Sequence, residues 1–122
     1  MIYISSPRIS RFLVEVVKDP EDLKRGLSYR QHLQPRRGML FVFPTVGKQS
    51  MWMPNMNFAL DIVWIDENKV IVKIEENVPP CKGSCSQSYS SYYRIKWAIE
   101  LNAGDANNIG LSVGMVLQFN EE

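Results

Sequence analysis

The chain has 122 residues, of which 45% are hydrophobic, 22% charged and 11% aromatic. This composition predicts one globular domain over residues 1–122 and excludes wholesale disorder. No apolar run approaches the roughly 18 to 20 residues of a membrane-spanning helix, so we expect no membrane span. Two cysteines exclude a disulfide-dense scaffold. Because the formal net charge is only +1, we expect no nucleic-acid partner.

The first half of the chain predicts a strand followed by a helix. In residues 11–18 (RFLVEVVK), Phe12, Val14 and Val16 alternate with Leu13, Glu15 and Val17, a pattern typical of a half-buried or fully buried strand. The run Asp-Pro-Glu-Asp at 19–22 supplies a capping side chain, a proline for the first helical position and two acids that suit a helix N-terminus. These signals predict a helix from Pro20 to about Arg30. Gly26 within it is a poor helix former, which indicates close packing at that position.

The rest of the chain predicts mainly strands. Residues 39–43 (MLFVF) are a continuous apolar run typical of a buried strand, and residues 59–65 and 69–74 flank a turn and predict a hairpin. Residues 77–91 form the longest predicted loop. Further expected elements are strands at 50–53, 95–101 and 115–119 and a short helix at 103–109. The sum is an α+β domain whose mainly antiparallel β-sheet is rolled into a barrel, with two short helices.

Positive charge is concentrated in one segment, from Leu23 to Leu60, which contains no Asp or Glu. Such a segment favours a local binding site for an anion, or else a solvated face that the acids of the remaining chain neutralise. The six basic residues are Lys24, Arg25, Arg30, Arg36, Arg37 and Lys48.

Few side chains in this sequence offer nucleophilic or metal chemistry. His32, the only histidine, fits either a helix C-terminus or a catalytic base. Cys81 and Cys85 lack the partners of a zinc signature, and a local disulfide, a reactive thiolate and no chemistry at all remain open. Met51 and Met53 could bind Cu(I) together with the cysteines, or simply pack in the core.

One carboxylate, Asp61, lies inside the apolar strand ALDIVWI. Burying it unpaired is costly, so it needs a cation or several amide donors, and Arg25 and Arg30 are the natural cations. The amide of Asn55 can pin a loop, and Trp52 can supply an aromatic wall. These residues together predict a small polar pocket in which an Arg–Asp pair meets a tryptophan.

Six ordered segments carry a family resemblance. KRGLSYR, RGMLFVFP, SMWMPNM, LDIVWID, a PPC loop and AIELNAGDANNIGLSVG resemble the prokaryotic domain-of-unknown-function family 192 over about residues 12–119. The sequence departs from the family pattern at Ser28, Met51 and Met56. The resemblance implies a β-rich α+β domain, often exported, without an established activity. The positions that match the family's motifs are Arg25, Gly26, Leu27, Arg30, Gly38, Met39, Leu40, Phe41, Phe43, Trp52, Met53, Asn55, Asp61, Pro80, Cys81, Glu100, Leu101 and Gly104.

The favoured function is a non-catalytic binding module for a small anionic ligand or a peptide. We predict no catalytic residue, no metal site and no cofactor. The alternatives are a thiol-dependent or hydrolytic enzyme that uses Cys81, or soft-metal (copper) binding. The N-terminal residues do not read as a secretory signal, which predicts a cytoplasmic protein, or an envelope or secreted one if a signal was trimmed. The predicted ligand-binding residues are Arg25, Arg30, Trp52, Asn55, Asp61, Cys81 and Tyr89.

Overall fold

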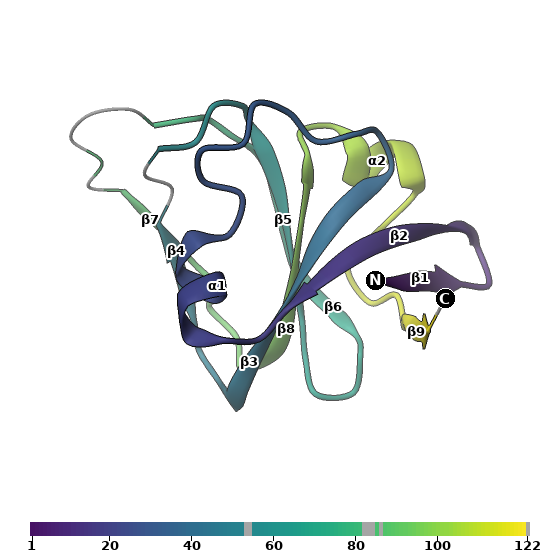
Figure 1. Ribbon diagram of the computed structural model, residues 1–122. Helices are drawn as coiled ribbons and strands as arrows, with labels where there is room; N and C mark the ends of the chain where they lie inside the picture. The colour runs from purple at the N-terminus through teal and green to yellow at the C-terminus, as the bar shows by residue number, and fades with distance from the viewer. Residues whose placement is uncertain (53–54, 82–84, 86, 122) are drawn as a thin grey trace.

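A computed structural model describes residues 1–52, 55–81, 85 and 87–121 (Figure 1). Strands dominate it, and the two helices of the described residues are short. In chain order the elements are β1 (Ile2–Ser6), β2 (Ile9–Val17), α1 (Pro20–Arg25), β3 (Arg37–Gly47), β4 (Ser50–Trp52), β5 (Leu60–Ile65), β6 (Ile71–Val78), β7 (Ser88–Ser90), β8 (Ile95–Asn102), α2 (Asp105–Ile109) and β9 (Gln118–Glu121).

A seven-stranded sheet has the order β6-β5-β8-β3-β2-β1-β9, and β4 pairs with β7 in a separate two-stranded sheet. All neighbouring strands are antiparallel except β2 and β3, which are parallel and are connected through α1. The predicted α+β class and mainly antiparallel sheet are therefore confirmed. The sheet curls, but β6 and β9 do not pair into a closed barrel. An isolated bridge between Val70 and Val116 links the segments beside these two edge strands.

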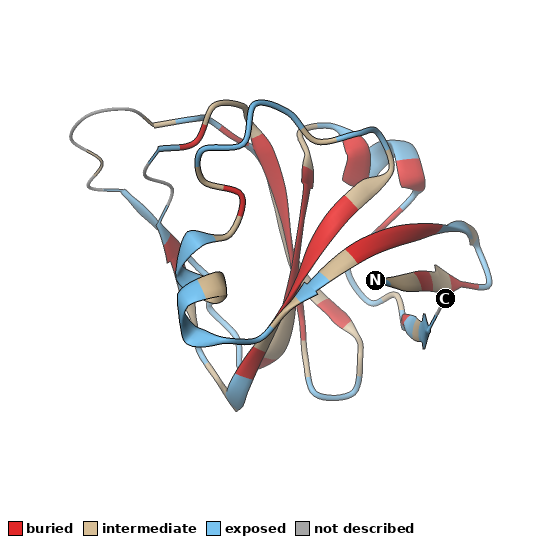
Figure 2. Ribbon diagram, viewed as in Figure 1, coloured by how far each residue is buried: buried red, intermediate tan, exposed pale blue. Residues whose placement is uncertain are grey.

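The sheet buries a different apolar cluster on each of its two faces. The first contains Ile99, Leu101 and Ala106 of α2, and the second contains Phe41, Trp64 and Ala98. This separation follows from the alternation of side chains along β8, whose successive residues point to opposite faces. Figure 2 shows the buried residues concentrated in the central strands. In Figure 1, α1, β4 and β7 lie at one side of the molecule, whereas α2 and both termini lie at the other.

Several elements differ from the sequence-based expectation. The first helix ends at Arg25, not Arg30, because the chain turns at Gly26 with a φ of 51°. Strand β1 had not been predicted, and the predicted loop 77–91 contains β7. The last strand begins at Gln118 instead of residue 115. The hairpin of β5 and β6 is confirmed.

Candidate functional site

A pocket of about 560 Å³ opens on the second face of the sheet. One wall is α1 with the turn that follows it, and the other wall is β4 together with Asn55 and Met56. The sheet supplies the floor. The lining residues are Glu21, Leu23, Lys24, Arg25, Gly26, Leu27, Ser28, Tyr29, Phe41, Phe43, Ser50, Met51, Trp52, Asn55, Met56 and Glu100.

The floor of this pocket contains a buried carboxyl group, that of Glu100. Strand β8 places it opposite Met39 of β3 and Ile62 of β5, and only 3% of the residue is exposed. Its Oε1 atom is buried and, within the described part of the chain, has no hydrogen-bond partner. Because burial disfavours the charged form, the pKa of this carboxyl rises from 4.5 to about 8. Glu100 is therefore mostly protonated at neutral pH, and it faces the pocket with one oxygen unused.

Gly26 lets the backbone of one wall approach this carboxyl closely. A Cβ atom at this position would lie 3.4 Å from Oε1 of Glu100 and 3.1 Å from Cζ of Phe41. The φ of 51° is also one that residues with a Cβ adopt at a cost. The predicted close packing at Gly26 is thus present, although it occurs at the helix end and not inside a helix.

The two walls are joined across the pocket mouth. The backbone N–H of Tyr29, in the turn after α1, donates to the carbonyl of Asn55 at 3.0 Å. Both residues line the pocket and both have positive φ values. Asn55 therefore lies in the predicted site, where its backbone carbonyl holds the walls together.

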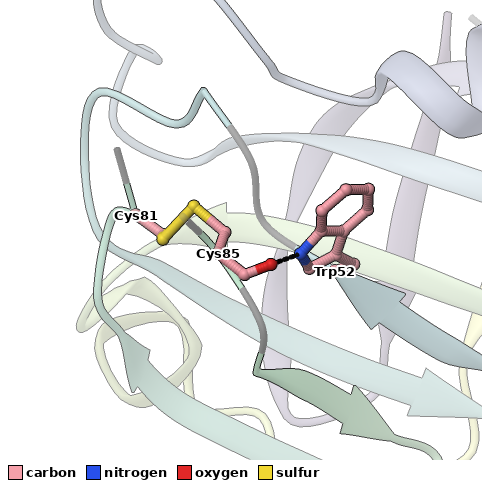
Figure 3. The surroundings of a disulfide bond; sticks show 3 residues. All are labelled: Trp52, Cys81 and Cys85. Atoms are coloured by element: carbon pink, nitrogen blue, oxygen red, sulfur yellow. Dashed lines mark hydrogen bonds between the residues drawn. A yellow bond between two sulfur atoms is a disulfide. The ribbon is translucent and has the colours of Figure 1, made fainter. Parts of the chain in front are cut away.

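Trp52 forms an exposed part of the second wall, with 56% of its surface accessible. Its indole Nε1–H donates to the carbonyl of Cys85, which forms a disulfide with Cys81 (Figure 3). Tyr89 pairs with Met51 across β4 and β7 and packs against the second apolar cluster, without lining the pocket. Cys81 and Tyr89 thus support the wall that carries Trp52.

The basic segment does not act as a unit. Arg25 and Lys24 are exposed at the end of α1 and line the pocket, and within the described part of the chain neither forms an ion pair. Arg30 instead pairs with Glu15, with N–O distances of 3.2 and 2.7 Å. Arg36 donates to the carbonyl groups of Ser10 and Arg11. Of the six basic residues of this segment, Lys24 and Arg25 are the two that line the pocket, and the placement of Arg30 there was wrong.

The predicted pairing of Asp61 with arginine was also wrong. Asp61 is fully buried, and its Oδ1 accepts the backbone N–H of Asn77 at 3.0 Å. Its Oδ2 accepts those of Gly104 and Ala106, both at 3.0 Å. Because β5 points this side chain toward α2, Asp61 lies on the opposite side of the sheet from the pocket. Of the two kinds of partner that the sequence allows for this carboxylate, a cation or several amide donors, the structure supplies the amides.

The residues considered for thiol, histidine or metal chemistry lie in other environments. The Cys81 sulfur is bonded to Cys85 and offers no thiolate, and His32 is exposed outside the pocket lining. Met51 is buried as a core residue, while Met53 lies outside the described residues. Residues 1–52, 55–81, 85 and 87–121 contain no group of three or more His, Cys, Asp or Glu that could hold a metal ion. Nor do these residues form a helix long and apolar enough to cross a membrane.

Sequence reasoning did not select Glu100 as a site residue. Its signal was available in the strand IKWAIEL, where Glu100 occupies the same face as Ala98 and Lys96. A charged residue at an inward position of a central strand is informative because buried carboxyls are uncommon. Asp61 gave the same signal, and only the structure distinguishes the satisfied acid from the unsatisfied one.

Comparison with solved structures finds the same fold in proteins from two bacteria. A protein from Sinorhizobium meliloti 1021, described as a candidate transcription regulator, matches with 32% identity and a TM-score of 0.87, covering 97% of this chain and 91% of that one. A protein of unknown function from Novosphingobium aromaticivorans DSM 12444 matches with 21% identity and a TM-score of 0.85, covering 96% and 83%. Comparison with the curated proteins gives no match. The model of the family DUF192 (Uncharacterized ACR, COG1430) matches residues 3–119, so the chain belongs to this family.

Proposed function

We propose that this chain is a non-catalytic binding module for a small organic ligand that carries an anionic group. The observation that supports this proposal is the buried carboxyl of Glu100 at the floor of a cavity of about 560 Å³, where its Oε1 has no hydrogen-bond partner among the residues that the structure describes. A buried polar atom without a hydrogen bond costs free energy, so native folds rarely retain one without a reason. A ligand that supplies the missing donor removes this cost when it binds.

The rest of the pocket fits such a ligand. Phe41, Phe43, Met51 and Met56 offer apolar surface, and a few polar groups lie among them. This mixture is typical of small-molecule sites. The exposed cations Lys24 and Arg25 attract an anionic group at the mouth. They belong to the basic segment in which the sequence predicts an anion-binding site.

The description of the Sinorhizobium meliloti relative as a candidate regulator does not lead us to propose nucleic-acid binding. In the described residues, α1 has 6 residues and α2 has 5, which is short for a helix that reads a DNA groove. The net charge of +1 provides no extended electrostatic surface for a phosphate backbone.

A fragment titration followed by NMR tests the proposal. The ¹⁵N-labelled protein is titrated with a library of small carboxylates that carry apolar groups, and we expect the shifted amides to map to Gly26, Ser50 and Asn55. Arg25→Gln should weaken the binding of these fragments several-fold, because it removes a cation at the pocket mouth. Arg94→Gln is the matched control, since Arg94 is also exposed but does not line the pocket. Shifts confined to other surfaces, or equal losses in both variants, would contradict the proposed function.

A further inference from the structure

The pocket has an ionisable acid at its floor and basic residues at its mouth. Glu100 is buried at the floor, whereas Lys24 and Arg25 are exposed at the mouth. The other charged residue of the lining is Glu21, which is also exposed. A ligand that spans the pocket would therefore contact an acidic group with its inner end and basic groups with its outer end.

The surfaces around the buried acid suit a cation. Phe41 and Phe43 line the floor with ring centroids 6.4 Å apart, and the thioethers of Met51 and Met56 lie in the same lining. Aromatic rings attract an ammonium group through their quadrupoles, and a desolvated carboxylate attracts it more strongly. An anionic group at this depth would instead lose its hydration beside an acid.

Size and polarity narrow the ligand further. The cavity of about 560 Å³ with mostly apolar walls accommodates a body with several apolar groups between its two charged ends. A short peptide with apolar side chains has this chemistry, because its amino end is an ammonium and its carboxyl end an anion several bonds away.

Resting on the function proposed above, we propose that the ligand is a short apolar peptide whose amino-terminal ammonium donates to Oε1 of Glu100 and whose carboxylate reaches Arg25 and Lys24. The ammonium supplies the hydrogen bond that Oε1 lacks, and binding transfers the carboxyl proton of Glu100 to solvent. Glu21, Lys24 and Arg25, all in α1, are the other charged groups of the lining. No covalent bond forms or breaks apart from this O–H ionisation.

Three matched probes test this assignment: the dipeptide Leu-Phe, its desamino analogue in which hydrogen replaces the ammonium, and its carboxyl-terminal amide. We expect the desamino analogue to bind at least about tenfold more weakly than Leu-Phe, as loss of a hydrogen bond to a charged group implies. The amide should lose several-fold, because it lacks the partner of Arg25. In Glu100→Gln the preference for Leu-Phe over the desamino analogue should collapse, whereas Glu76→Gln, a change of an exposed acid, should keep it.

Proton release gives a second readout that needs no variant. Since the pKa of Glu100 is about 8, calorimetry at neutral pH in buffers of different ionisation enthalpy should show about one proton released per bound Leu-Phe and none for the desamino analogue. Equal affinities without proton release would overturn the peptide assignment and leave the binding function standing. The same holds if the carboxylate fragments bind in the pocket and the dipeptide does not. If neither fragments nor peptides bind there, both proposals are overturned.

Discussion

The ionisation of Glu100 makes the stability of the fold depend on pH. Burial raises the pKa of its carboxyl from 4.5 to about 8, so between these values the folded chain holds a proton that the unfolded chain has released. Stability therefore falls as pH rises through this window, by up to about 1.4 kcal/mol per pH unit. Glu100→Gln removes the ionisable group and should be more stable than the native chain by a few kcal/mol at pH 8, with the difference vanishing near pH 4.5.

Urea unfolding at a series of pH values measures this difference. Glu76→Gln is the control, because Glu76 is exposed and its change should leave the pH dependence of the native chain intact. Parallel stability curves for the native chain and Glu100→Gln would show that the carboxyl is solvated in the folded state.

Gly26 should be intolerant of even one added carbon. In Gly26→Ala the new Cβ meets Phe41 at 3.1 Å and the backbone keeps a φ of 51°, so we expect a loss of about 1 to 3 kcal/mol in the free energy of unfolding. Gly47→Ala is the matched control, since nothing lies within 4 Å of its Cβ position. Its unfolding midpoint should change little, and comparable losses in both variants would argue against crowding at Gly26.

The sequence predicted a site residue correctly only where its position follows from the neighbouring element of the chain. Arg25, Trp52 and Asn55 come together in the pocket because they lie near α1 and β4, which cover one face of the sheet. Which side of the sheet Asp61 faces depends on the register of β5 against β8, which periodicity does not give.

At the scale of elements, Asp61 ties three of them together. Its carboxylate in β5 accepts amides from Asn77 in β6 and from Gly104 and Ala106 at the start of α2. Asp61→Asn turns an amide NH₂ toward these N–H donors, and we expect a loss of about 2 to 4 kcal/mol in thermal or urea unfolding. Asp66→Asn is the control: Asp66 accepts two backbone amides in a turn, partly exposed, and should lose less. Equal losses would contradict a special role for burial.

We expect the Cys81–Cys85 disulfide to hold the side chain of Trp52 in place. Cys85 accepts the indole N–H of Trp52, so the double variant Cys81→Ser/Cys85→Ser should shift the Nε1 resonance of Trp52 in the NMR spectrum. The resonances of Trp64 and Trp97, which lie in the large sheet, are internal controls and should not move. An unmoved Trp52 signal would show that the wall does not depend on the disulfide.

Elements were predictable where their signal is continuous along the chain. The run MLFVF and the hairpin of β5 and β6 follow from local apolar patterns. The helix was overextended because its first turn has strong signals, and only the tertiary contact of Gly26 with Phe41 shows why the chain turns there. The sequence does not predict β7 because its three residues, SYS, are too few to show the alternating pattern of a strand. Its pairing with β4 is also long-range.

Across the whole molecule, the sheet beneath the pocket is deeply buried, whereas the elements that form the pocket walls make few buried contacts. All six residues of β5 are buried, whereas α1 contains no buried residue and β4 and β7 pair over only three residues each. Local opening is easiest where few apolar contacts are lost. Hydrogen exchange should therefore be slowest in β5 and β8 and much faster in β4 and β7. Similar protection in both regions would mean that the pocket walls open only with global unfolding.

The single parallel strand pair has a consequence for the diversity of these proteins. Since β2 and β3 run in the same direction, the chain between them must cross one face of the sheet, and residues 18–36 form that crossover together with one pocket wall. Its two ends are fixed by the sheet and Gly26 and Leu27 are packed against the sheet, but its exposed residues, such as Lys24 and Arg25, can change without altering any strand register. Exchanging this segment between homologues is thus a route to grafting a new binding preference onto an unchanged scaffold.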